Sequence, residues 1–148
     1  MSFATYSDLK TSIAGYLARS DLTSQIPDFI TFAENRLRRE LRIRQMLKSV
    51  TTSTVSGDST VELPADFIEI RDFVVMTNPI QPMSYSSPSA LSNDPRASEV
   101  GVPISYTILA NDFQVSPAPD GVYTVRLLYF SAPAYLSSSN TSNVFLTT

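Results

Sequence analysis

The sequence predicts an α+β protein: an N-terminal helical hairpin followed by a β-rich, mostly antiparallel lobe. Apolar residues recur at helical spacing over the first 48 residues. From Val50 onward, segments rich in Val and Thr alternate with Pro and other turn formers. We therefore expect a helical hairpin over residues 1–48, a β-rich lobe over 49–133 and an extended tail over 134–148. A chain of 148 residues is long enough to bury one core or two small ones.

The first predicted helix begins at a capping box. Thr5 and Asp8 have the spacing in which the N-cap side chain and the third helical residue each bond the other's backbone N–H. The helix is expected to end near Arg19, before a polar break at Ser20-Asp21. Its apolar face consists of Leu9, Ile13, Tyr16 and Leu17.

A second, longer helix is predicted over Ile26–Lys48. Pro27 suits its first turn, where the missing N–H would be unpaired in any case. Its apolar stripe consists of Ile30, Ala33, Leu37 and Leu41. Glu34 precedes Arg38 by four residues, and Glu40 precedes Arg44 by four, which is the favourable order for ion pairs on a helix. Arg44 falls close to the apolar stripe, so we expect either a bend there or an acidic partner.

The charge is polarised along the chain. Residues 1–48 carry eight basic and five acidic residues, whereas residues 49–148 carry three and nine. Six of the 11 basic residues fall within the 13 positions from Arg36 to Lys48. Such a helix face is either simply solvated or complementary to an acidic surface, including one on another copy of the chain.

The remaining elements are predicted from strand-like segments and turn formers. Val50–Ser56 and Thr60–Leu63 should form a hairpin around Gly57, and 64–69 a helical turn. Pro82 restricts 80–85 to a sheet edge. The other expected elements are strands at 70–76, 104–109, 113–116 and 122–130, and a helical turn at 88–91. In the strand 122–130, one face should consist of Tyr123, Val125, Leu127 and Tyr129. The Ser-rich tail is expected to be mobile.

Composition argues against an enzyme. The chain has no His and no Cys, so the usual general base, thiolate chemistry and disulfides are all excluded. Its four glycines are scattered, so there is no phosphate-binding loop. Asp66, Glu69 and Asp72 could bind Mg²⁺ if they lay on one helix, but a change from helix to strand near Ile70 would separate them. We expect no catalytic residues, no cofactor and no metal.

Other classes of site are also disfavoured. The aromatic residues of the predicted strands suit core packing better than stacking on bases. No stretch approaches the ~20 apolar residues of a membrane span, and no signal peptide is evident. We expect a soluble protein made in a cytoplasm, with no membrane partner.

Three stretches carry a resemblance to a known family. They are YSDLKTSIAGYLARSDLTSQIPDFITFAENRLRREL, LPADFIEIRDF and YTILANDFQVSPAPDGVYTVRLLYFSAPAYLSSSNTSNVFL. Together they resemble the head-to-tail adaptor proteins (connector, tail-tube-A-like) of tailed bacteriophages, particularly short-tailed ones. The resemblance covers nearly the whole chain and includes no catalytic motif.

The resemblance implies a structural, non-enzymatic virion protein. Such a protein would form a ring, dodecameric in the family, in the neck between capsid and tail, with DNA passing through it only as cargo. Its partners would be other copies of itself, the portal protein, and a tail or nozzle protein. The implied fold is a helical bundle with a β-rich lobe inserted between its helices. Family members continue past the equivalent of Val144–Leu146 into further helices, whereas this sequence ends at Thr148. We therefore expect the two N-terminal helices to lack their bundle partners and to leave an apolar surface uncovered.

The charge pattern predicts the partner-binding residues. On the basic helix they are Arg38, Arg39, Arg42 and Arg44, which would pair with carboxylates of a neighbouring copy or of the portal. On the β-rich lobe, Asp66, Glu69 and Asp72 would receive them. The alternative is a nucleic-acid-binding module that uses the arginine-rich helix on phosphates.

Overall fold

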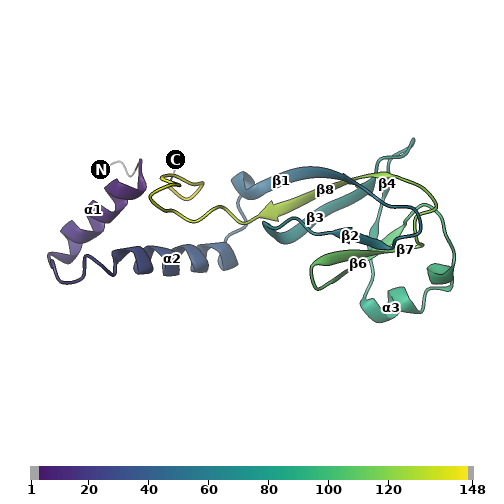
Figure 1. The fold of residues 1–148 in the computed structure, drawn as a ribbon, viewed down its shortest axis with the longest axis horizontal. Coiled ribbons are helices and arrows are strands. Elements are labelled where there is room, and N and C mark those ends of the chain that lie inside the picture. The colour runs from purple at the N-terminus through teal and green to yellow at the C-terminus, as the bar shows by residue number, and fades with distance from the viewer. Residues whose placement is uncertain (1–3, 147–148) are drawn as a thin grey trace. The chain divides into compact units, whose positions relative to one another are not determined.

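The computed structural model describes residues 4–146 and divides into two units. The helical unit joins Met1–Met46 to Ala132–Thr148, and the β unit is Leu47–Ser131. Figure 1 shows the elements of each unit. The helical unit therefore contains both ends of the sequence, and the whole β unit is inserted between them.

Helix α1 (Tyr6–Leu17) begins at the predicted capping box. The Thr5 hydroxyl oxygen accepts a hydrogen bond from the Asp8 N–H (3.2 Å), and the Asp8 carboxylate accepts one from the Thr5 N–H (3.0 Å). The helix ends at Ala18, whose φ of 50° is left-handed. The predicted start and the approximate end of this helix are confirmed, but Tyr16 and Leu17 of its predicted apolar face are exposed, at 78% and 37%.

Helix α2 (Ile26–Glu40) is eight residues shorter than predicted. Leu41 is extended, a 3₁₀ turn follows at Arg44–Met46, and the first strand begins at Leu47. The Arg42 guanidinium donates to the carbonyl oxygens of residues 38, 39 and 41 at 3.0, 3.4 and 2.7 Å. The last carbonyl oxygens of a helix have no partner within it, and a basic side chain can bond them. These bonds stabilise the end of α2 at Glu40.

The C-terminal segment, residues 132–146, packs within the helical unit. Leu136 is buried together with Tyr6, Ile26 and Ile30. The Tyr6 N–H also donates to the Thr141 carbonyl at 2.7 Å. The expectation of a mobile tail is therefore wrong for this segment, and residues 147–148 lie outside the described part of the chain.

The β unit consists of two four-stranded sheets. In the first sheet the order is β1 (Leu47–Ser53), β8 (Thr124–Ser131), β3 (Phe67–Val75) and β4 (Gln81–Pro82). In the second it is β2 (Thr60–Glu62), β7 (Asp112–Ser116), β6 (Ser105–Leu109) and β5 (Ser84–Tyr85). Neighbours are antiparallel except β5 and β6. Two short helices, α3 (Pro88–Ser92) and η2 (Pro95–Ser98), follow β5.

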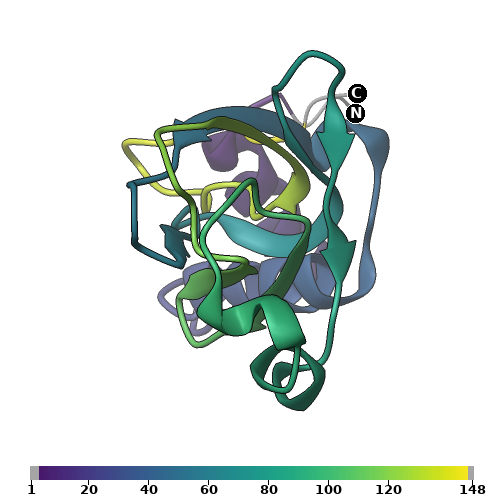
Figure 2. The ribbon, with the colours of Figure 1, turned by 90° about the vertical axis from the view of Figure 1, so that its right-hand side faces the viewer.

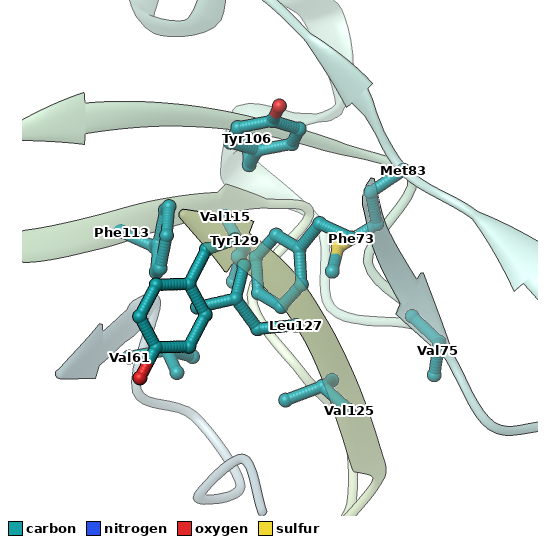
Figure 3. Close-up of a cluster of buried hydrophobic side chains, with 10 residues drawn as sticks. All are labelled: Val61, Phe73, Val75, Met83, Tyr106, Phe113, Val115, Val125, Leu127 and Tyr129. Carbon is teal, nitrogen blue, oxygen red and sulfur yellow. The ribbon is translucent and has the colours of Figure 1, made fainter. Parts of the chain in front are cut away.

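The core of the β unit lies between the two sheets. The rings of Phe73, Tyr106, Phe113 and Tyr129 meet there, with Phe73 and Phe113 centred 4.8 Å apart (Figure 3). Alternate residues of β8 point into this core as the sequence predicts: Val125, Leu127 and Tyr129 are buried. Burial of such apolar and aromatic area is the main stabilising term of this unit.

Two local predictions are wrong. The segments on either side of Gly57 do not form a hairpin, because β1 pairs with β8 and β2 pairs with β7. Thr54 is buried and bonds Tyr123, and the Gly57 N–H donates to the Pro119 carbonyl at 2.7 Å, so this loop packs against residues 119–123 instead. The predicted helical turn at 64–69 is interrupted, since β3 already begins at Phe67.

Strands β4 and β5 follow each other in the chain and form an edge of the first and of the second sheet, respectively. β4 pairs with β3 in the first sheet, and β5 pairs with β6 in the second (Figure 2). Pro82 therefore lies at a sheet edge, as predicted. The fold class, α+β with mostly antiparallel strands, is confirmed. Among residues 4–146 no helix is long and apolar enough to cross a membrane.

Candidate partner-binding surfaces

Arg38 is engaged within the helical unit. Its guanidinium lies 3.5 Å from the centre of the Tyr135 ring and donates a hydrogen bond to the Pro133 carbonyl. The Tyr135 hydroxyl in turn donates to Asn35 at 2.5 Å. Arg38 and Asn35 therefore hold the C-terminal segment on α2, and Arg38 has less of its guanidinium to offer a partner.

The other arginines of this region differ in their surroundings. Arg42 caps α2, as described above, and Arg36 pairs with Glu40 at 3.0 Å. Arg39 and Arg44 are exposed. Neither of these last two side chains has a hydrogen-bond or ion-pair partner among residues 4–146, so they are the best-presented of the four predicted partner-binding arginines.

Glu34 is a buried residue whose structural role the sequence interpretation missed. Its side chain is only 4% exposed and accepts the Leu136 N–H at 3.1 Å and the Asn143 side-chain amide at 2.7 Å. The ion pair with Arg38 that the four-residue spacing suggested is not formed. The available signal was its position four residues after Ile30, next to the apolar stripe, where an acidic residue needs internal partners.

Asp66 is also engaged within its own unit. Its carboxylate accepts from Lys48 Nζ and from the Tyr129 hydroxyl, both at 2.7 Å. Burial raises the pKa of the Asp66 carboxyl, but the hydrogen bonds from Lys48 and Tyr129 and the Lys48 charge outweigh burial, so its pKa lies below the ordinary value. The hydrogen bond to Asp66 raises the pKa of Lys48. Burial, followed by the bond to Asp66, raises the pKa of Tyr129.

Glu69 and Asp72 lie apart from the Asp66 contacts. Both are exposed residues of β3, where Glu69 is opposite Phe130 and Asp72 opposite Leu128 on β8. Both therefore lie on the sheet face that points away from the core. Within residues 4–146 no group of three or more His, Cys, Asp or Glu side chains is placed to hold a metal ion.

The two units carry opposite net charges. The helical unit has seven basic and five acidic residues, a net charge of +2, and the β unit has four and nine, a net charge of −5. Each unit can therefore attract a macromolecular surface of the opposite charge.

An open apolar groove of about 310 Å³ lies on the helical unit. Phe29 of α2, which is 44% exposed, contributes to its wall. The groove is lined by Leu9, Ile13, Phe29, Ile30, Ala33, Glu34, Leu37, Leu136, Phe145 and Leu146. The groove is thus formed jointly by α1, α2 and the C-terminal segment of the helical unit.

The comparisons with known proteins identify the family of the chain. No curated protein matches the chain. The family model described as SU10 adaptor protein matches residues 4–148, which is nearly the whole sequence. The chain therefore belongs to the SU10 adaptor protein family, whose members are phage head-to-tail adaptors.

Proposed function

We propose that this protein assembles as a ring in the virion neck and joins the portal of the capsid to the tail. Membership of the adaptor family supports the structural role. The observation that carries the ring is the opposite charge of the two units, +2 and −5. A basic surface on one copy that meets an acidic surface on the next is a heterologous contact, and such contacts generate a closed ring when the rotation from copy to copy closes.

The residues that make these contacts are part of the proposal. On the basic side, Arg39 and Arg44 would provide most of the attraction, since they are exposed and have no partner in the described part of the chain. Arg38 and Arg42 would act mainly by holding the helical unit together. On the acidic side, Glu69 and Asp72 are exposed residues of β3, and Asp66 is bonded to Lys48 and Tyr129.

The proposed role needs no catalytic residue, cofactor or metal. It also treats DNA as cargo. A nucleic-acid-binding module is less well supported, because the chain is acidic overall and Arg38 and Arg42 are used in internal hydrogen bonds. Tight binding of phosphates would also oppose the movement of DNA through a ring.

Light scattering on the purified chain, alone and mixed with its cognate portal, tests the proposal. Twelve copies of 16.3 kDa would add about 196 kDa to the mass of the portal. We expect a ring-sized increase in the presence of the portal, and a ring formed without it would place the assembly information in this chain alone. A chain that stays at its monomer mass at every concentration, with and without portal, would overturn the proposal.

A further inference from the structure

One face of α2 combines an exposed aromatic ring with two arginines. Phe32 is 68% exposed and the Arg36 side chain is 74% exposed, and Arg39 is exposed as well. Residues spaced by four and seven lie on one side of an α-helix, so these three form a stripe, here called the α2 stripe. At 1.5 Å per residue the α2 stripe spans about 10.5 Å.

The α2 stripe differs from the side of α2 that binds the C-terminal segment. That other side carries Glu34 and Arg38, which bond residues 133–143. A large aromatic side chain left exposed between charged residues is a common feature of interaction surfaces. The α2 stripe is therefore available for a partner.

The second sheet carries a row of residues with matching chemistry. Leu109 on β6 is opposite Asp112 on β7, and Asp112 is opposite Glu62 on β2. Val61 and Phe113 next to them are buried, so this row points away from the core. We call these three residues the carboxylate row, and their strands are labelled in Figure 1. Adjacent strands are about 4.8 Å apart, so the row spans about 9.6 Å.

The carboxylate row is unfavourable when it is alone. Glu62 and Asp112 are like charges directly opposite each other, which destabilises a pair of strands. Neither forms an ion pair with any residue of the described chain. Leu109 at the end of the row is 43% exposed. A partner that brought two positive charges and an apolar group would relieve the repulsion and cover Leu109.

We propose that the α2 stripe of one copy docks on the carboxylate row of a neighbouring copy. Phe32 packs on Leu109, Arg36 pairs with Asp112, and Arg39 pairs with Glu62. The charges are complementary and the two spans agree within about 1 Å. The exposed pair between Arg36 and Glu40 opposes this only weakly, because surface ion pairs contribute little. The inference rests on the proposed ring; it pairs Arg39 with Glu62 of the neighbouring copy, which leaves Glu69 and Asp72 to Arg44.

Thiol crosslinking in assembled rings tests the contact. The chain has no Cys, so variants Arg39→Cys and Glu62→Cys each carry a single thiol. The two variants are mixed, assembled on the portal and treated with a short bismaleimide. The matched control replaces Glu62→Cys with Glu99→Cys, another exposed acidic residue of the same unit. We expect a covalent dimer from Arg39→Cys with Glu62→Cys and at most trace dimer from the control mixture.

The outcomes separate this inference from the function on which it rests. Rings that form without dimer above the control level would overturn the contact and leave the adaptor role intact. A chain that forms no ring on the portal would overturn both. A chain carrying both thiols that crosslinks only to itself would place the contact within one molecule, which also overturns the proposal.

A charge exchange gives a second readout. Arg39→Glu alone and Glu62→Arg alone should each weaken ring assembly by about tenfold, because each sets like charges together. The double variant restores an opposite pair in every interface and should recover most of the loss. Failure of the double variant to assemble better than either single variant, with all three folded by circular dichroism, would count against the pairing.

Discussion

The Arg38 guanidinium lies 3.5 Å from the centre of the Tyr135 ring, and this cation–π pair joins α2 to the C-terminal segment. The contact links two parts of the sequence between which the whole β unit is inserted. It therefore assigns Arg38 a role in holding the helical unit together.

Replacement of Arg38 by Ala should loosen the C-terminal segment. The change removes the cation–π contact and the hydrogen bond to the Pro133 carbonyl, with an expected loss of about 2 kcal/mol from the stability of the helical unit. Hydrogen exchange of the Leu136 amide reports the effect. Arg39→Ala is the matched control, because Arg39 is exposed, and it should leave that exchange rate nearly unchanged. Equal exchange in the two variants would contradict the assignment.

Replacement of Glu34 by Ala should lower the stability of the protein more than the loss of an exposed acidic residue would. The variant leaves the Leu136 N–H without its acceptor in a buried site and removes one of the hydrogen bonds of the Asn143 amide, at a cost of about 2 kcal/mol. Thermal unfolding followed by circular dichroism measures this. Glu40→Ala, which removes only an exposed partner of Arg36, should change the melting temperature much less. A smaller effect for Glu34→Ala than for Glu40→Ala would refute the buried role.

The bonds of Asp66 predict a pH dependence of stability. Because the pKa of Asp66 is lower in the folded protein than its ordinary value of 3.8, its carboxylate stabilises the fold fully above that value. The contribution is lost as the pH falls through the folded-state pKa. Urea unfolding of the parent and of Asp66→Asn should therefore differ most near neutral pH and converge in acid. Lys48→Met should reproduce part of the effect, since the Tyr129 bond remains. A difference that grew in acid would contradict the sign.

Much of the fold could be predicted from local signals. The capping box at Thr5 and the alternation along β8 depend on neighbouring residues only, and both are as expected. The partners of β1 and β2 could not, because distant contacts decide them: residues 119–123 bind the loop that was predicted to be a hairpin turn. The early end of α2 could not either, because the helical spacing does not show that the Arg42 guanidinium folds back onto the last carbonyl oxygens of the helix.

The candidate surfaces could likewise be predicted only in part from the sequence. The concentration of arginines and the acidic excess elsewhere are visible in the composition. Spacing along a helix placed Glu34 beside Arg38, whereas both bind the C-terminal segment. The row of Leu109, Asp112 and Glu62 is invisible in sequence, since the register between three strands brings it together.

Replacement of Glu62 by Gln should have opposite effects on the monomer and on assembly. In the monomer it removes the repulsion with Asp112, so stability should rise by about 0.2–1 kcal/mol in urea unfolding at low salt. In the ring it removes the charge that Arg39 meets in the proposed contact, so a higher concentration of the chain should be needed for assembly on the portal. Glu99→Gln serves as the control and should change neither quantity. A defect in folding would lower stability and assembly together. A variant that is more stable but assembles less well would therefore identify Glu62 as a residue whose charge serves a contact with a partner. A variant that is more stable and assembles as well as the parent would show that the carboxylate pair serves no contact between copies.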